Sequence, residues 1–394
     1  MERIGIFGGT FNPTHFGHIR SAQAAAHTLN LSKVLMIPTN QPPHKELTAD
    51  MPTPQQRLEM LRIATEGDPL LEASDLEICR GGVSYTYETV ERVRGMYPDA
   101  ELFLLMGSDM FFSFQNWKCT ERILAQVTLV VFCRGTKGEK AAISAKKAEL
   151  VQQGNRVFCL DNKVLEISST QLRRMLAFQC ASEFLPAGIV KYIREHDLYH
   201  VNADWKNLPM DQLEQVVISL LKPNRVAHVL GCRDTAARLA KIWGVDETDA
   251  ARAGMLHDVT KALDGPLQLT LCREYGKILS DFFRKYPKTL HALTGSLVAE
   301  RIFGENEKVV AAIESHTTGK AAMTMLEKII YVADYMEPNR DFPGVEKLRE
   351  LAETNMDAAL KLGLETTLAH LARLGDEVSP ETQEALEYLN AKIN

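Results

Sequence analysis

Residues 4–18 read IGIFGGTFNPTHFGH, and the helix-prone stretch IRSAQAAAHTL follows directly. A short strand-forming run leads into Gly8-Gly9, where the missing Cβ atoms let backbone N–H groups approach a phosphate. The helix that follows adds the positive end of its dipole. The stretch therefore predicts a phosphate-binding turn between a first strand and a first helix. It has neither the GxGxxG spacing nor the P-loop lysine, which disfavours redox-dinucleotide and Walker-type sites.

Two histidines, His15 and His18, stand three residues apart at the start of this helix. That spacing places both imidazoles on one helical face, beside a bound phosphate. We expect them to donate hydrogen bonds to the α-phosphate of a nucleotide rather than to lie in a solvated loop. We assign no role to His27 and His370.

Outward from this turn, the first half of the chain alternates apolar β-rich runs with helical patterns. The runs are IGIF from 4, KVLMIP from 33, ELFLLMG from 101, VTLVVFCR from 127 and RVFCL from 156. Strands separated by helices predict a doubly wound, Rossmann-like α/β domain with a parallel sheet.

After Val164 helical periodicity takes over, which predicts an all-α second half. The polar, proline-containing stretch HVNADWKNLPMD at 200–211 suits a short linker. We therefore expect a first domain over 1–203 and a second over 208–394.

The chain's length and composition support this division. Its 394 residues exceed what one hydrophobic core usually serves, and 45% hydrophobic and 24% charged residues are typical of a soluble protein. A net charge of -6 argues against nucleic acid as a partner. The sequence shows neither a signal peptide nor an 18-residue apolar run, so we expect a cytoplasmic protein without membrane contact. The seven cysteines are scattered and form no CxxC pair, so we expect reduced thiols rather than disulfides.

Several further segments carry a resemblance, in order and spacing, over residues 1–200. They are Pro42-Pro43-His44-Lys45, Ser84-Tyr85-Thr86, Gly107-Ser108-Asp109, Trp117, Arg134 and Ile167-Ser168-Ser169-Thr170-Gln171-Leu172-Arg173. With GGTFNPTHFGH, they resemble bacterial nicotinate-nucleotide adenylyltransferase. That family often has Asp where Asn12 stands, which leaves the phosphate-binding turn intact.

The resemblance implies transfer of AMP from ATP, accompanied by Mg²⁺, to nicotinate mononucleotide. Such a displacement needs positioning and neutralised charge rather than a covalent intermediate. Catalysis would fall to His18, His15, Lys45 and Arg173. ATP binding would fall to Gly8, Gly9, Thr10, Phe11, Asp109, Ser168, Ser169 and Thr170, and pyridine binding to Thr86, Tyr85, Trp117 and Arg134. The alternative is a relative acting on another phosphate, such as pantetheine phosphate; Ser84-Tyr85-Thr86 and Trp117 favour the pyridine.

The second half contains a different set of polar residues, each in a segment of helical character. They are His228, the adjacent pair His257-Asp258, His291, His316 and Asp334. Imidazole and carboxylate suit first-row divalent metals, and the absence of CxxC spacing argues against a structural zinc site. His257-Asp258 and Asp334 stand among apolar residues, where buried charge needs compensation. A metal would supply it.

The order His, His-Asp, Asp resembles the HD-domain phosphohydrolases, and His291 and His316 match members with two metals. The stretch SHTTGKAAMTMLEKIIYVADYMEPNRDFPGVEKLR at 315–349 resembles bacterial symmetrical diadenosine tetraphosphate hydrolases. The resemblance implies two iron ions bridged by Asp258 and two ADP as products. Candidates for polyphosphate contacts are Thr317, Thr318, Lys261 and Arg340.

Two alternatives stay open for this second half. HD domains share ligands and differ in their pockets, so the substrate could instead be a guanosine alarmone or a nucleoside monophosphate. The second half could also be a nucleotide-sensing regulatory module, although the complete set of metal ligands disfavours that interpretation. The sequence leaves the oligomeric state open, a homo-oligomer included.

Overall fold

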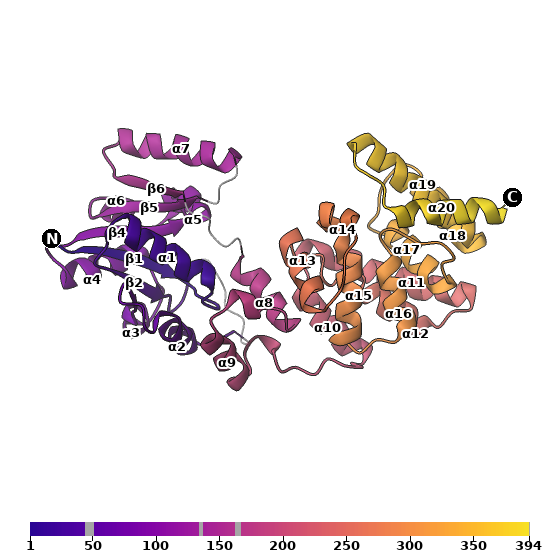
Figure 1. Ribbon diagram of the computed structural model, residues 1–394, viewed down its shortest axis with the longest axis horizontal. Helices are drawn as coiled ribbons and strands as arrows, with labels where there is room; N and C mark the ends of the chain where they lie inside the picture. Colours follow the sequence, from indigo (N-terminus) through magenta and orange to yellow (C-terminus); the bar gives the residue numbers. More distant parts are fainter. Residues whose placement is uncertain (44–50, 134–136, 162–166, 394) are drawn as a thin grey trace. The chain divides into compact units, whose positions relative to one another are not determined.

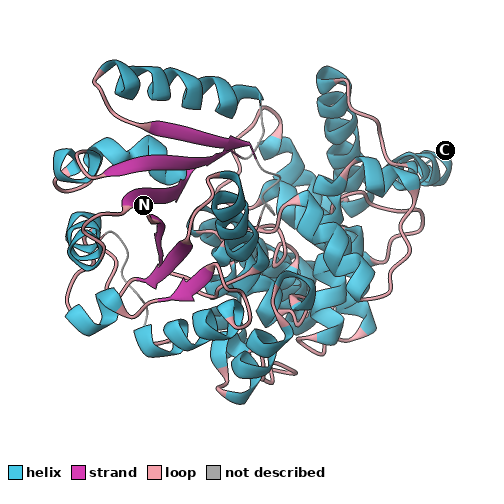
Figure 2. Ribbon diagram, turned by 60° about the vertical axis from the view of Figure 1, so that its left-hand side comes forward, coloured by secondary structure: helices cyan, strands magenta, loops and turns pink. Residues whose placement is uncertain are grey.

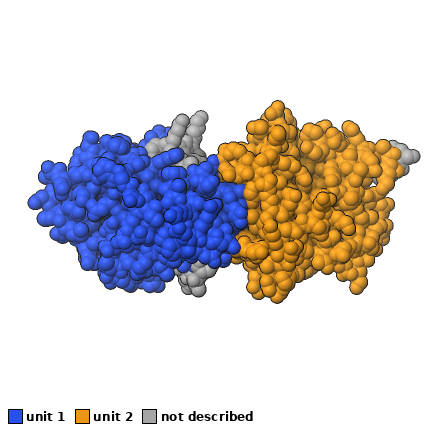
Figure 3. Space-filling model, turned by 60° about the horizontal axis from the view of Figure 1, so that its bottom comes forward, with its two compact units in different colours: residues 1–202 blue, residues 203–394 orange. Residues whose placement is uncertain are grey.

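The computed structural model describes residues 1–43, 51–133, 137–161 and 167–393, and it divides the chain into two compact units. Unit 1 comprises Met1–Asn202 and unit 2 comprises Ala203–Asn394. Figure 1 labels their helices and strands, and Figure 3 colours the two units separately. Each unit has its own hydrophobic core, so each is described by itself.

Unit 1 contains a six-stranded parallel sheet in the order β3-β2-β1-β4-β5-β6. The strands are β1 Arg3–Gly9, β2 Lys33–Pro38, β3 Leu71–Ala73, β4 Glu101–Gly107, β5 Val127–Cys133 and β6 Val157–Asp161. The five runs singled out from the sequence all form strands, which confirms the α/β fold class. The short strand β3 was not predicted.

Helices cover both faces of this sheet (Figure 2). The helices of unit 1 are α1 Phe16–Thr28, α2 Pro54–Thr65, α3 Leu76–Arg80, α4 Thr86–Met96, α5 Ser108–Ser113, α6 Thr120–Leu124, α7 Lys137–Gln152, α8 Ser169–Ala177 and α9 Ala187–Glu195, with short 3-10 turns η1 Phe114–Asn116, η2 Ser182–Phe184 and η3 Leu198–His200. Side chains alternate between two cores, with Leu35 and Ile37 in one and Val34 and Met36 in the other. Burial on both faces explains why these strands are almost wholly apolar.

The order of the strands reverses between β1 and β4, which are neighbours at the centre of the sheet. Ligands of open α/β sheets bind outside the carboxyl ends of the strands at such a reversal. The turn after β1 and helix α5 after β4 both begin there. The fold therefore brings the glycine turn and Asp109 to the edge where a nucleotide is expected.

The described residues of unit 2 form helices and loops without a strand, which confirms the predicted all-α second half. Its elements are α10 Met210–Leu220, η4 Pro223–Arg225, α11 Val226–Trp243, α12 Glu247–Leu256, α13 Gly265–Glu274, α14 Asp281–Lys285, η5 Pro287–Leu290, α15 His291–Arg301, α16 Glu307–Ser315, α17 Met325–Met336, α18 Val345–Thr354, α19 Met356–Leu374 and α20 Pro380–Ile393. Helix α11 packs closely on α12, because a Cβ on Gly254 would stand 2.8 Å from the Cα of Arg233.

The segment that enters unit 2 is packed onto it. Trp205 is only 8% exposed and stacks on Phe303 with ring centroids 5.7 Å apart. The N–H of Asn207 donates to the Phe303 carbonyl at 2.9 Å. Among the helices that the structure describes, none is both long and apolar enough to cross a membrane.

Candidate nucleotide-binding turn and candidate metal centre

The turn after β1 is shaped by a buried aromatic side chain. Phe11 has a left-handed backbone (φ 48°) and is 2% exposed. Its ring lies edge-on to Phe7 at 5.7 Å and to His18 at 5.0 Å. The Phe11 ring therefore packs against the buried side of the turn, and only the Phe11 backbone is available to a phosphate.

The histidine pair lies at the start of α1, as the spacing predicts. The rings of His15 and His18 are 3.7 Å apart between centroids. The backbone N–H of His15 donates to Nδ1 of His18 at 3.3 Å, so the neutral His18 ring carries its proton on Nε2. Burial lowers the pKa of His18 to about 4, and burial together with His18 lowers the pKa of His15. At neutral pH His18 therefore presents one N–H donor and no charge.

Arg57, which the sequence analysis did not single out, holds this turn in place. It is fully buried in α2, and its guanidinium donates to the carbonyls of Thr10 and Thr39 at 2.7 Å and of Asn40 at 3.2 Å. Burial lowers the Arg57 pKa from its ordinary value. The sequence carries one sign of this role: Arg57 precedes Leu61 by four residues, so a cation lies on the apolar face of α2.

The other side of the turn is held through Asn12. Tyr199 donates its hydroxyl to Oδ1 of Asn12 at 2.6 Å, and Arg173 donates Nη1 to the Asn12 carbonyl at 2.9 Å. Arg173 also donates Nη2 to Oγ1 of Thr170 at 3.2 Å. Ser168 is the N-cap of α8, and Ser169 is the helix's first residue. The amino end of α8 and the glycine turn therefore lie together, although 161 residues separate Arg173 from Asn12.

The predicted pyridine-binding residues come from two segments that meet. The backbone N–H of Asn40 donates to Oγ of Ser84 at 2.9 Å, which docks the start of α4 beside the end of β2. Tyr85 is the N-cap of α4 and Thr86 its first residue. Lys118 lies 4.3 Å from the Tyr85 ring centroid, and its neighbour Trp117 packs half-buried on Phe114.

Three other residues were predicted for this site, and the structure describes one of them. Asp109 lies exposed in the first turn of α5, at the carboxyl end of β4. Lys45 and Arg134 fall outside the described residues. Their roles stay predictions.

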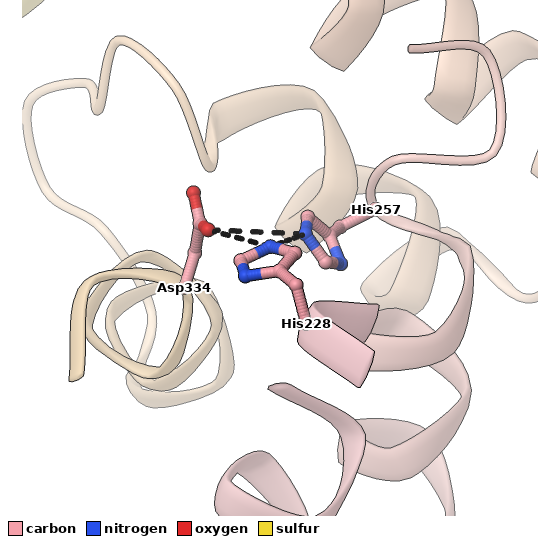
Figure 4. A group of neighbouring side chains, drawn as sticks. All are labelled: His228, His257 and Asp334. Atoms are coloured by element: carbon pink, nitrogen blue, oxygen red, sulfur yellow. Dashed lines mark hydrogen bonds and ion pairs between the residues drawn. The ribbon is translucent and has the colours of Figure 1, made fainter. Parts of the chain in front are cut away.

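In unit 2 the six predicted metal ligands lie together, contributed by α11, α17 and the ends of α12, α15 and α16. Nε2 of His228 lies 3.0 Å from Oδ1 of Asp334 and 3.2 Å from Nε2 of His257 (Figure 4). Oδ2 of Asp258 lies 3.5 Å from Nε2 of His257. Its Oδ1 lies 3.4 Å from Nε2 of His291 and 3.9 Å from Nε2 of His316. Asp258 thus stands between two groups of ligands.

All four histidines are oriented in the same way. Nδ1 of His257, His291 and His316 lies 2.7, 2.9 and 2.7 Å from the backbone carbonyl three residues earlier. Nδ1 of His228 instead lies 3.1 Å from Oε1 of the buried Glu337. Each Nδ1 must carry the proton to satisfy these acceptors, so each neutral ring turns the lone pair of Nε2 towards the cluster.

This arrangement calls for cations. Two Nε2 lone pairs face each other at 3.2 Å in His228 and His257, and Oδ1 of Asp258 is buried without a hydrogen-bond partner among the described residues. Burial opposes the ionisation of Asp258, but His257 and other neighbours hold its pKa below the usual range. The residues therefore fit divalent metal ions: His228, His257 and Asp334 form one ligand group, and His257, Asp258 and His316 form another.

Cationic and hydroxyl side chains surround the cluster. Nη2 of Arg340 lies 2.6 Å from Oδ1 of Asp334, and Nζ of Lys261 lies 2.8 Å from Nε2 of His291. Oγ1 of Thr317 lies 3.1 Å from Nε2 of His291. Thr318 is not brought to the cluster in this way, since its hydroxyl donates to the Gly319 carbonyl. Arg225, which the sequence analysis missed, forms an ion pair with Asp258.

Comparison with known proteins assigns each half separately. Residues 6–175 match the Cytidylyltransferase-like family and residues 225–339 match the HD domain. A "Probable nicotinate-nucleotide adenylyltransferase" of Borrelia garinii subsp. bavariensis is 37% identical over 198 residues, covering 50% of this chain and 94% of the relative. One of the same name from Neisseria meningitidis serogroup B is 36% identical over 204 residues, covering 50% and 99%.

A solved structure from Clostridium acetobutylicum also matches part of the chain. It is described as a predicted HD superfamily hydrolase involved in NAD metabolism. It is 37% identical, covers 47% of this chain and 98% of its own, and has a TM-score of 0.46.

The first prediction concerns Glu337, whose carboxylate orients His228. Gly231 leaves it room, since a Cβ there would stand 2.4 Å from Oε2 of Glu337. Glu337→Gln keeps an acceptor but removes the charge, so we expect metal affinity to fall about ten- to a hundredfold. Titration of the metal-free protein with Mn²⁺ measures this. Glu314→Gln, on the exposed side of α16, is the control, and equal affinities in the two variants would contradict the assignment.

The second prediction concerns pH. The pKa of His18 is about 4 in the folded protein and about 6.5 when unfolded, so the unfolded chain binds more protons between these values. Stability should therefore fall as pH decreases from 6.5 to 4. Thermal unfolding across this range measures how steeply stability changes with pH. The dependence should be shallower in His18→Gln, and an equal dependence in both proteins would refute the lowered pKa of His18.

Proposed function

The chain belongs through its N-terminal half to the nicotinate-nucleotide adenylyltransferase family and carries an HD domain in its C-terminal half, and we propose that both halves are enzymes. The N-terminal half would join AMP from ATP to nicotinate mononucleotide, releasing pyrophosphate. The observation that carries this is the neutral His18, fixed as an Nε2–H donor at the switch point of the sheet. A pre-oriented donor at that position suits an α-phosphate whose charge increases in the transition state.

The other residues would divide between the two substrates. Backbone N–H groups of 8–11 would hold phosphates of ATP, and Mg²⁺ would accompany the nucleotide. The amino end of α8 and Arg173 would bind the β- and γ-phosphates, because a helix N-terminus and a guanidinium both favour anions. Tyr85, Thr86 and Trp117 would hold the pyridine ring and its carboxylate. Lys45 and Arg134 remain proposed contacts outside the described residues.

For the C-terminal half we propose symmetrical hydrolysis of diadenosine tetraphosphate to two ADP. The convergence of six imidazole and carboxylate groups, five of them buried and Asp334 half-buried, carries this proposal. Oδ2 of Asp258 lies near His257 and its Oδ1 lies near His291. Such residues would hold two divalent ions, which we propose to be iron. When bound, the ions would polarise a phosphoryl group and acidify a water molecule.

This chain's own side chains would do the rest. Arg340 and Lys261 lie where they can neutralise the charge of a polyphosphate. Thr317 can donate a hydrogen bond to a phosphate oxygen from its place between His291 and His316. The six proposed ligands are imidazoles and carboxylates, with no hydroxyl or thiol among them, which is consistent with direct attack by water.

The third prediction tests His18. We expect His18→Ala to reduce formation of nicotinate adenine dinucleotide at least about a hundredfold, because a donor to the transition state is lost. His18→Gln keeps an N–H donor and should lose less. Product formation from nicotinate mononucleotide and ATP is followed by chromatography. His27→Ala, on the exposed part of the same helix, is the control, and a similar loss there would remove His18 from its role.

The fourth prediction tests the metal centre. His257→Ala and Asp258→Ala should abolish metal-dependent release of ADP from diadenosine tetraphosphate while preserving adenylyltransfer, because the two activities use separate ligand sets. His370→Ala is the matched control, since this histidine is exposed on α19. Hydrolysis that survives in both cluster variants would refute the assignment.

The nature of the products identifies the reaction. Symmetrical cleavage yields ADP alone, whereas asymmetrical cleavage yields ATP and AMP. A panel that includes a guanosine alarmone and nucleoside monophosphates tests the alternative substrates, and metal analysis of the purified protein tests for iron.

A further inference from the structure

Arg225 joins the metal centre from outside the predicted ligand set. It ends the short turn η4, directly before the helix that carries His228. Its Nε and Nη2 both contact Oδ2 of Asp258. The Arg225 side chain is 27% exposed, whereas that of Asp258 is 1% exposed. The guanidinium therefore links the most buried carboxylate of the cluster to the solvent.

Arg340 has the same relation to the second carboxylate of the cluster. It donates to Oδ1 of Asp334, and its side chain is 34% exposed against 14% for Asp334. Lys261 contacts the imidazole of His291, which lies on the other side of Asp258. Each ligand group thus has at least one solvent-reaching cation beside it.

The charges of these residues balance before any metal binds. Three carboxylates, Asp258, Asp334 and Glu337, stand against the three cations Arg225, Lys261 and Arg340. Two divalent ions would leave about four positive charges in excess. They would also take over the oxygens of Asp258 and repel the guanidinium that pairs with it.

We propose that Arg225 is a phosphate-binding residue that exchanges Asp258 for a phosphate of the substrate once the centre holds its cations. The inference rests on the proposed hydrolase function and extends it, since the excess charge matches a tetraphosphate bridge with one negative charge on each phosphate. The planar guanidinium can bind a phosphate through two parallel N–H donors. Arg225 would then act on the side of Asp258 that faces His228, and Lys261 on the side that faces His291.

The experiment measures binding rather than turnover. The full chain is loaded with Mn²⁺, and its proposed adenylyltransferase site is filled with nicotinate adenine dinucleotide so that ADP can bind only elsewhere. Affinities for Mn²⁺ and for ADP are then determined by titration calorimetry for wild type, Arg225→Gln and Arg225→Lys. We expect Arg225→Gln to retain its Mn²⁺ and to bind ADP at least tenfold more weakly. Arg225→Lys should be intermediate, because an ammonium keeps the charge without the two parallel donors.

Arg238→Gln is the matched control, since Arg238 lies exposed on α11 and pairs with Glu353 away from the cluster. It should change neither affinity. Unchanged ADP affinity in Arg225→Gln, or loss of Mn²⁺ from it, would overturn the proposal, because Arg225 would then only hold Asp258 in place. If the ADP effect is present but wild type leaves diadenosine tetraphosphate intact, the proposed substrate fails and the role of Arg225 stands.

Discussion

The position of one proton on each buried histidine decides what each half of this chain can bind. In unit 1, Nδ1 of His18 accepts a backbone hydrogen bond, so Nε2 is a donor, which suits an anion. In unit 2, Nδ1 of four histidines donates instead, so every Nε2 is an acceptor, which suits cations. The same side chain therefore serves opposite purposes through its partner at Nδ1.

Most of this orientation in unit 2 is local. His257, His291 and His316 each pair with the carbonyl three residues earlier, at or beside the end of a helix where carbonyl groups lack helical partners. Only His228 depends on a distant group, Glu337, which is 109 residues away. The local backbone thus orients three of the rings, and the packing of α17 against α11 orients the fourth.

The sequence predicted those features that depend on a residue type or on a periodic pattern of apolar residues. Apolar runs predicted five strands, and the six histidines and aspartates proposed as metal ligands lie close together in unit 2. The strand β3 escaped because three residues, LEA, have no period to detect. Arg57, Tyr199, Arg225 and Glu337 escaped for another reason. Their importance lies in contacts with residues 17 to 187 positions away, which no local pattern encodes.

The packing of Trp205 on Phe303 defines where the two halves can be cut apart. A truncated chain that starts at residue 208, the boundary suggested by polarity alone, would strip a stacked indole from the Phe303 ring and free the Phe303 carbonyl from Asn207. Loss of such an aromatic pair costs about 1 kcal/mol beyond the apolar area it exposes. A cut that separates the two halves therefore belongs upstream of Trp205, so that the HD-domain half keeps the side chain that covers Phe303.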